Sequence, residues 1–179
     1  VFFQRHLEAR DIAFLTAPFT RRSRRSIFAG FQMALKNGGI SFDKSRLFVY
    51  ASDVEYSDSI DEFENGRVLA RQFLKAKCPA TAVVTINDIT AFGIISELLG
   101  SGVRVPEDVS IIGFDDISVS TMVNPPLTTI NQPSYETGRL AAHMLIDKIE
   151  RDVKMNSRVL LKPTVVERSS VKALTNVVP

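Results

Sequence analysis

The sequence predicts an α/β fold built on a doubly wound parallel sheet. Short apolar runs alternate along the chain with longer segments whose apolar residues recur every three or four positions, as in amphipathic helices. The short runs are apolar almost throughout, which is typical of strands that helices cover on both faces. Strands and helices that alternate with short connections form open sheets with right-handed crossovers. Because 45% of the 179 residues are hydrophobic, the chain can bury a sizeable core.

The first two thirds of the chain supply the strands and helices of this sheet. Strands are predicted at Ile12–Thr16, Leu47–Ala51, Thr81–Ile86 and Val109–Gly113. The helices between them are predicted at Ser23–Lys36, Ile60–Lys77 and Asp88–Ser101. The last helix has the clearest pattern, because Ala91, Ile94 and Leu98 fall on one face. Ser59 and Asn87 are the expected N-caps.

After Phe114 the alternation of strands and helices stops. A short strand at Leu127–Ile130 precedes a helix at Ser134–Arg151, and two extended pieces follow at Val159–Leu161 and Thr164–Glu167. The proline-rich segment Pro125–Pro133 is interpreted as a crossover that leaves the first sheet. We expect residues 172–179 to form a loose tail.

Composition excludes several classes of protein. The net charge of +2 creates no general field for a polyanion, so contact with nucleic acid would have to be local. A single cysteine, Cys78, supports neither an internal disulfide nor a metal cluster, and a half-buried structural thiol is the expectation. No apolar run is long enough to span a bilayer, and no signal peptide opens the chain. We therefore expect a cytoplasmic protein without a metal or another cofactor.

Polar residues follow every predicted strand, where ligands bind in open parallel sheets. They are the run from Arg21 to Arg25, then Ser52, Asp53, Glu55 and Tyr56, then Asn87 and Asp88, and finally Asp115 and Asp116. Carboxylates accept hydrogen bonds from neighbouring hydroxyls, amides both donate and accept, and an aromatic face stacks on a sugar ring. The pattern favours a polyhydroxylated ligand.

Several of these residues also have a purely structural explanation. Asn87 can cap a helix and contact the ligand at once, and Asp88 suits the positive end of the same helix. Asp115 lies outside any predicted helix, which favours a ligand role, whereas Asp116 is better explained as a structural partner. The run of arginines is either a solvated face or, in part, a site for an anionic sugar derivative.

Five motifs in order resemble those of LacI/GalR-type transcriptional regulators. They are IAFLTAP at the first strand, AGFQMAL in the first helix, INDITAFGI after the third strand, VRVPEDVSIIGFDD, and PPLTTINQ. The resemblance extends from about Phe3 to Ser170. It implies a type I periplasmic-binding-protein-like sensor domain with two lobes, of which the second is incomplete here. It also implies a homodimer that senses a sugar or related effector and binds operator DNA through an N-terminal helix-turn-helix absent from this chain.

The resemblance divides the chain between the lobes and names effector-binding positions. Residues 1–126 would form the C-terminal lobe, 127–158 a crossover and helix of the N-terminal lobe, 159–171 the returning strands, and 172–179 the tail. The implied effector-binding residues are Asp115, Asn87, Gln132, Arg21 and Ser23, and Tyr56 is the preferred stacking aromatic. One departure is Ile27, which stands where the family often has an effector-binding arginine. Arg24 or Arg25 would have to replace that arginine from a different helix face.

Two other classes of function remain as alternatives. A periplasmic sugar-binding protein of a transporter shares this fold, although the motifs favour the regulator. An enzyme is disfavoured, because the chain contains no dinucleotide-binding glycine motif, no P-loop and no nucleophile elbow. Its histidines, His6 and His143, fall on predicted helices away from the strand exits.

Overall fold

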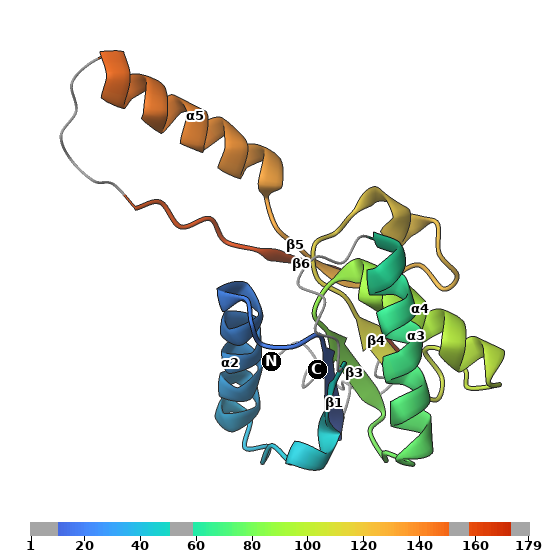
Figure 1. The fold of residues 1–179 in the computed structure, drawn as a ribbon. Coiled ribbons are helices and arrows are strands. Elements are labelled where there is room, and N and C mark those ends of the chain that lie inside the picture. Colours follow the sequence, from blue (N-terminus) through green and yellow to red (C-terminus); the bar gives the residue numbers. More distant parts are fainter. Residues whose placement is uncertain (1–10, 51–58, 151–157, 173–179) are drawn as a thin grey trace, which may run out of the picture.

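The computed structural model describes residues 11–50, 59–150 and 158–172 (Figure 1). The sheet consists of four parallel strands, in the order β2 (Leu47–Val49), β1 (Ile12–Thr16), β3 (Ala82–Thr85) and β4 (Ser110–Ile112). The chain adds β2 on one side of β1 and β3 on the other. The strand order therefore reverses at β1 and β3, and their carboxyl ends are the expected place for a ligand crevice.

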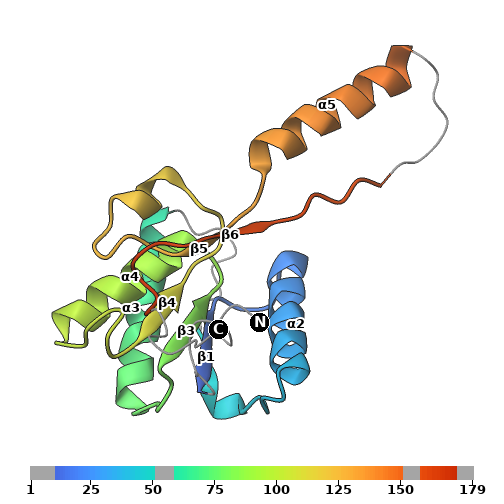
Figure 2. The same ribbon diagram turned by 180° about the vertical axis from the view of Figure 1, so that it is seen from behind.

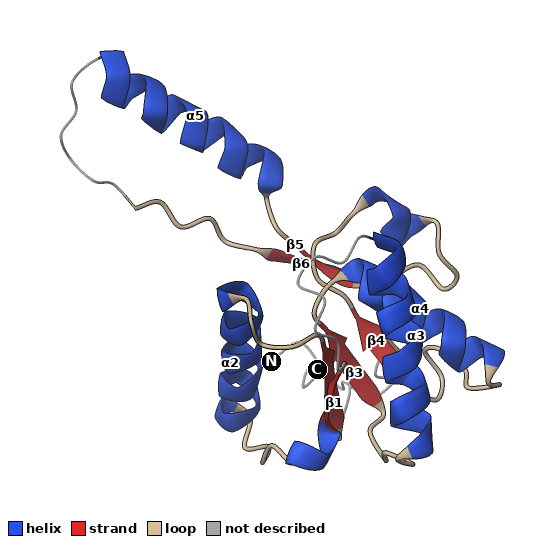
Figure 3. Ribbon diagram, in the orientation of Figure 1, coloured by secondary structure: helices blue, strands red, loops and turns tan. Residues whose placement is uncertain are grey.

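Helices cover both faces of the sheet, as the sequence predicts. Helix α2 (Arg22–Asn37) lies on one face, and α3 (Ser59–Lys75) and α4 (Asp88–Gly100) lie on the other (Figure 3). The predicted bounds of these elements agree with the observed ones to within two residues. The fold of this part is therefore the predicted doubly wound α/β sheet.

The two faces of the sheet are packed differently. Between the sheet and α3 and α4 lies a mainly aliphatic core with a few aromatic rings, in which Leu15, Val83 and Ile111 are fully buried. On the α2 face, phenylalanines pack against one another, and the ring of Phe14 lies 5.0 Å from that of Phe31. Both faces are sealed, so a ligand has access only at the edges of the sheet.

Helices α3 and α4 touch at two glycines. A Cβ atom at Gly93 would overlap the carbonyl oxygen of Phe63, and one at Gly66 would overlap the carbonyl oxygen of Thr90. The backbones therefore approach more closely than any side chain would permit. This close packing sets the position of α3 relative to the start of α4.

The chain then leaves the sheet along the edge of β4. Thr128 pairs with Ile112, and the short strand β5 (Thr129–Asn131) pairs antiparallel with β6 (Thr164–Val166). Between them, helix α5 (Ser134–Glu150) stands away from the sheet in both views (Figures 1 and 2). No residue of α5 is buried. The predicted crossover is thus observed, with β5 shifted toward the C-terminus from the predicted Leu127–Ile130.

Some expectations for the residues after Phe114 differ from the structure, and one lies outside the described residues. The predicted extended piece at Val159–Leu161 forms no strand, because no described strand lies beside it to accept its hydrogen bonds. The segment Ser118–Pro126, in which the sequence shows no regular pattern, contains a 3₁₀ helix at Ser118–Thr121. The predicted tail beyond Lys172 lies outside the described residues. Cys78 is half-buried and free, as expected.

The glycine contact between α3 and α4 can be tested by adding one methyl group. We expect Gly93→Ala to lower the free energy of unfolding by roughly 1–3 kcal/mol, because the new Cβ overlaps backbone that cannot move without separating the helices. Gly100→Ala in the same helix is the control, since nothing lies within 4 Å of its Cβ position. Urea denaturation measures both. Equal effects of the two substitutions would contradict the close packing.

Candidate functional site

A pocket of about 320 Å³ opens at the carboxyl ends of the strands. Every described strand exit contributes to it: α2 follows β1, α3 follows β2, Asn87 follows β3 and Asp115 follows β4. Gln132, on the crossing segment, closes one side. The residues that line the pocket are Arg21, Ser23, Arg24, Ser26, Ile27, Glu62, Ile86, Asn87, Phe114, Asp115 and Gln132. The site therefore joins segments that lie far apart in the sequence.

Asn87 caps α4 and lines the pocket at once. Its Oδ1 accepts a hydrogen bond of 2.8 Å from the backbone N–H of Thr90, as an N-cap does. Its Nδ2 donates to Glu62 of α3 at 2.9 Å. The amide is thus held from both ends, and the carboxylate of Glu62 is held at the pocket wall.

Asp115 presents a carboxylate to the pocket from a strained backbone. Its φ of 128° lies in a region of backbone conformation that residues other than glycine rarely adopt. Gln132 Nε2 donates to its Oδ1 at 2.6 Å. Burial raises the pKa of Asp115 to about 6, and the charges of Asp88 and Glu62 add to this shift, although the bond from Gln132 opposes it. The pocket therefore holds an acid that titrates close to neutral pH.

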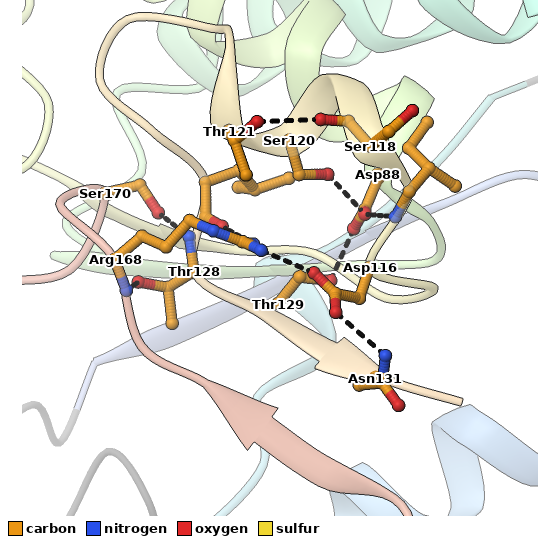
Figure 4. A network of polar contacts seen from close by, with 12 residues as sticks. Asp88, Asp116, Ser118, Ser120, Thr121, Thr128, Thr129, Asn131, Arg168 and Ser170 are labelled. Atoms are coloured by element: carbon orange, nitrogen blue, oxygen red, sulfur yellow. Dashed lines mark hydrogen bonds and ion pairs between the residues drawn. The ribbon is translucent and has the colours of Figure 1, made fainter. Parts of the chain in front are cut away.

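Asp116, the next residue, is not among the residues that line the pocket, and it bonds to the two crossing segments (Figure 4). One carboxylate oxygen accepts from Asn131 of β5 at 2.8 Å, and the other from Arg168, just after β6, at 2.7 Å. Burial acts to raise the pKa of Asp116, but the bonds from Arg168 and Asn131 outweigh it and lower the pKa below its ordinary value. The structural role expected for Asp116 is confirmed.

Asp88 is fully buried and is not among the residues that line the pocket; it lies within a network of polar contacts (Figure 4). Its carboxylate accepts hydrogen bonds from the backbone of Ile117 at 3.0 Å, from Ser120 Oγ at 2.6 Å and from Thr129 Oγ1 at 2.5 Å. The prediction from the helix dipole is therefore incomplete, because Asp88 also joins α4 to the 3₁₀ helix and to β5. A Cβ at Gly113 would overlap this carboxylate, so only glycine fits there.

The run of arginines divides between pocket and solvent. Arg21 and Arg24 line the pocket, whereas the guanidinium of Arg25 donates to the carbonyls of Phe19 and Thr20. Ile27 also lines the pocket, next to Arg24. Of the two replacements considered for the arginine expected at position 27, Arg24 lies at the pocket and Arg25 does not.

Five of the six residues predicted to bind the effector line this one pocket: Asp115, Asn87, Gln132, Arg21 and Ser23. The sixth, Tyr56, lies outside the described residues, as do Ser52, Asp53 and Glu55. Sequence reasoning missed Glu62 and Phe114. Glu62 is an acid in the first turn of the helix after β2, which marks it as a strand-exit residue. Phe114 directly precedes Asp115 at the exit of β4.

Residues typical of catalysis or metal binding do not gather in the described part of the chain. Among the residues searched, no group of three or more His, Cys, Asp or Glu is arranged to hold a metal ion. His143 is exposed on α5, and His6 lies outside the described residues. None of the described helices is both long and apolar enough to cross a membrane.

The sequence profile of the periplasmic binding protein-like domain matches residues 4–171. The ribose operon repressor of Escherichia coli (strain K12) is 33% identical over 159 residues, which cover 89% of this chain and 46% of the repressor. A LacI family regulator from Enterococcus faecium with bound ribose superposes with a TM-score of 0.79 at 29% identity, covering 94% of this chain and 59% of that one. The lac repressor dimer bound to operator and an anti-inducer superposes with a TM-score of 0.79 at 26% identity, covering 93% and 54%.

These similarities agree with the fold and with the position of the pocket. The chain belongs to the periplasmic binding protein-like domain family, and within it to the C-terminal effector-binding domains of LacI/GalR-type regulators. It spans less than half the length of the ribose operon repressor.

The raised pKa of Asp115 makes the stability of the fold depend on pH. Because the folded-state pKa of about 6 lies above the ordinary value of 3.8, the folded protein holds a proton that the unfolded chain has already lost. The stabilising contribution of Asp115 is therefore fully present in acid and is lost as the pH rises through about 6. We expect Asp115→Asn to raise the unfolding temperature more at about pH 7.5 than at about pH 4.5.

Asp108→Asn is the control for this measurement. Arg104 lowers the pKa of Asp108 to about 2 through its hydrogen bonds, so Asp108 stays ionised across the same range. Its substitution is expected to have the same effect at both pH values. A pH-independent effect of Asp115→Asn would show that the Asp115 carboxyl titrates normally.

Proposed function

We propose that this chain is the effector-sensing part of a transcriptional repressor that responds to a sugar or a related metabolite. The observation that carries the proposal is that Asp115, Asn87, Gln132, Arg21 and Ser23 line one pocket. These residues come from separate parts of the sequence, and the sequence alone predicts each of them. The relatives support the proposal, since one is a ribose operon repressor and another is a LacI family regulator with bound ribose.

The chemistry of the pocket suits a polyhydroxylated ligand. The carboxylates of Glu62 and Asp115 accept hydrogen bonds from neighbouring hydroxyl groups, and Gln132 and Asn87 supply amide donors. Ile86 and Phe114 provide the apolar surface on which the carbons of a sugar ring can lie. Tyr56, the preferred stacking residue, remains part of the proposal.

The proposed mechanism is closure of two lobes about the crossing segments. Residues 1–126 would form one lobe, 127–158 a crossover and helix of the other, and 159–171 the returning strands. The exposed apolar side chains of α5 support this division, because Leu145 and Ile149 are 60% and 73% exposed. An apolar groove of about 560 Å³ between α5 and residues 158–163 would receive the rest of the second lobe. A ligand that contacts both lobes stabilises one arrangement by its differential contacts.

The proposal extends to partners outside this chain. We propose a homodimer that binds operator DNA through an N-terminal helix-turn-helix, as the lac repressor dimer bound to operator suggests. The expected cytoplasmic location goes with this proposal, since a repressor has to reach DNA. The exposed apolar residues Ile60, Val119 and Met122 suit a subunit interface. The transporter alternative is less favoured, because the similar proteins named above are regulators of transcription.

We also propose that the chain has no enzymatic activity. One relative, which matches 89% of this chain, is the ribose operon repressor of Escherichia coli. The pocket contains two carboxylates and two guanidinium groups but no nucleophile paired with a base among its lining residues.

Asp115→Ala in the full-length protein tests the effector role directly. We expect the substitution to abolish the effector response while operator affinity without effector stays unchanged, because Asp115 lines the pocket and makes its side-chain bond to Gln132. Operator binding with and without effector, measured by fluorescence anisotropy, gives both quantities. Asp108→Ala, which removes a carboxylate outside the pocket lining, is the matched control. A normal response of Asp115→Ala would remove Asp115 from the site.

The two-lobe mechanism predicts weak ligand binding by this chain alone. The residues described here form one wall of the proposed cleft, and a ligand held from one side loses the contacts of the other lobe. We expect calorimetry to detect little or no sugar binding to the isolated chain and clear binding to the full-length protein. Micromolar binding of a sugar by the isolated chain would contradict the need for a second lobe.

A further inference from the structure

Charges of opposite sign lie in different elements around the pocket. Helix α2 contributes the guanidinium groups of Arg21 and Arg24, whereas the carboxylates of Glu62 and Asp115 come from α3 and from the exit of β4. Donors and acceptors for neutral hydroxyl groups are present without the arginines, since Asn87 and Gln132 supply amides. The α2 wall therefore carries positive charge beyond what a neutral sugar requires.

Arg24 differs from the other arginines of its run. Within the described run from Arg21 to Arg25, Arg24 is half-buried while the remaining arginines are exposed. Its Nη1 donates to the carbonyl of Pro18 at 3.1 Å, which orients the group and leaves further N–H donors for a ligand. Burial lowers the pKa of Arg24, and the charge of Arg21 lowers it further, although Glu62 acts in the opposite direction. Glu62 offsets part of the repulsion between the two arginines, and an anionic group at this wall would offset more of it.

The side chains near Arg24 suit an anionic group at this wall. Ser23 and Ser26 offer hydroxyl donors on the same helix and also line the pocket. Ile27, one turn further along, presents an apolar surface where relatives with the family arginine would present a charge. The positive charge is thus concentrated toward the start of α2. Glu62 and Asp115, which come from other elements, repel an anion and accept hydrogen bonds from hydroxyl groups. A ligand that carries both an anionic group and hydroxyl groups therefore fits in one orientation.

We infer that the ligand of this pocket is a sugar derivative that bears a phosphate or carboxylate group, and that Arg24 is the residue that selects for it. The inference rests on the proposed function and adds the charge of the ligand. The anionic group accepts hydrogen bonds from Arg24 and Arg21, and the sugar hydroxyls donate to Asp115 and Glu62. Charge-assisted bonds to a guanidinium in a half-buried site are stronger than neutral ones, so they dominate the selection.

Pairs made of a neutral sugar and its anionic derivative test this inference in the full-length protein. The probes are ribose and ribose 5-phosphate, glucose and glucose 6-phosphate, and glucose and glucuronate, with affinities measured by calorimetry. We expect one or more anionic members to bind at least roughly tenfold more tightly than the neutral parent, the effect of a hydrogen bond to a charged group. The phosphate and carboxylate pairs tell the two anionic groups apart. Added salt is expected to weaken the binding of the anionic ligand more than the binding of its neutral parent.

Arg24→Gln and Arg25→Gln form a matched pair of variants. Arg24→Gln is expected to remove the preference for the anionic member, because the anionic ligand loses more affinity than its neutral parent does. Arg25→Gln should leave both affinities unchanged, because its guanidinium bonds to backbone carbonyls outside the pocket. Thermal unfolding of both variants separates loss of fold from loss of binding.

Three results would overturn the inference, and they bear differently on the proposed function. Neutral sugars that bind as tightly as their anionic derivatives would refute the inference and leave the sensing function intact. If Arg24→Gln lowers the affinity for neutral and anionic ligands equally, the selective role of Arg24 is refuted, but the preference of the pocket for an anionic ligand is not. Binding of no sugar or sugar derivative, with the protein folded, would refute both the inference and the proposed function.

Discussion

Asp88 is fully buried at the start of α4, and its carboxylate accepts three hydrogen bonds from residues far along the chain. Two donors come from the 3₁₀ helix and its N-terminal neighbour, and the third comes from β5. A buried carboxylate is costly unless its oxygens are satisfied, so these donors and Asp88 require one another. The start of α4, the loop after β4 and the first crossing strand are thereby held as one unit. Asn87 and Asp115 owe their relative position to this unit, because one precedes Asp88 and the other lies in the loop.

The adjacent residues Asp115 and Asp116 have different roles within one turn. Both residues have positive φ, so their side chains point in different directions from adjacent backbone positions. Asp115 lines the pocket, and Asp116 bonds to Asn131 and Arg168 on the two crossing strands. Movement of either strand acts on Asp116 and therefore on the backbone that carries Asp115. The proposed ligand contact and the contact to the crossing segments are thus only one peptide unit apart.

Much of the fold and of the site could be predicted because both depend on local patterns. The strands of the sheet are apolar runs, and topology alone brings their exits together, which explains why Asn87, Asp115 and Ser23 could be identified. Glu62 was missed because its approach to Asn87 depends on the close contact of α3 and α4, and nothing in the sequence around Gly66 and Gly93 specifies their partners. The extended piece predicted at Val159–Leu161 belongs to no described strand, since an apolar run forms a strand only beside another strand.

The roles of the charged residues were harder to predict than their positions. Asp88 and Asp116 both follow strands, as Asp115 does, yet one lies in the core and the other joins the crossing strands. The residue type is the same in all three cases. What separates them is the set of donors that the fold brings to each carboxylate, and these donors lie 15 to 52 residues away in sequence. Which arginines near the start of α2 line the pocket and which do not is likewise clear only from the structure.

The hydrogen bond of 2.6 Å from Gln132 to Asp115 has a consequence for any molecule that enters the pocket. A ligand that donates to Asp115 meets an acceptor that is already engaged, so it has to share the carboxylate with Gln132 or displace it. The gain in free energy is then the difference between two hydrogen bonds and not the whole of one. Displacement also frees the residue that follows β5, at the point where the chain leaves the sheet. Gln132 is therefore an internal competitor for Asp115, and a molecule that displaces it but donates only weakly gains little.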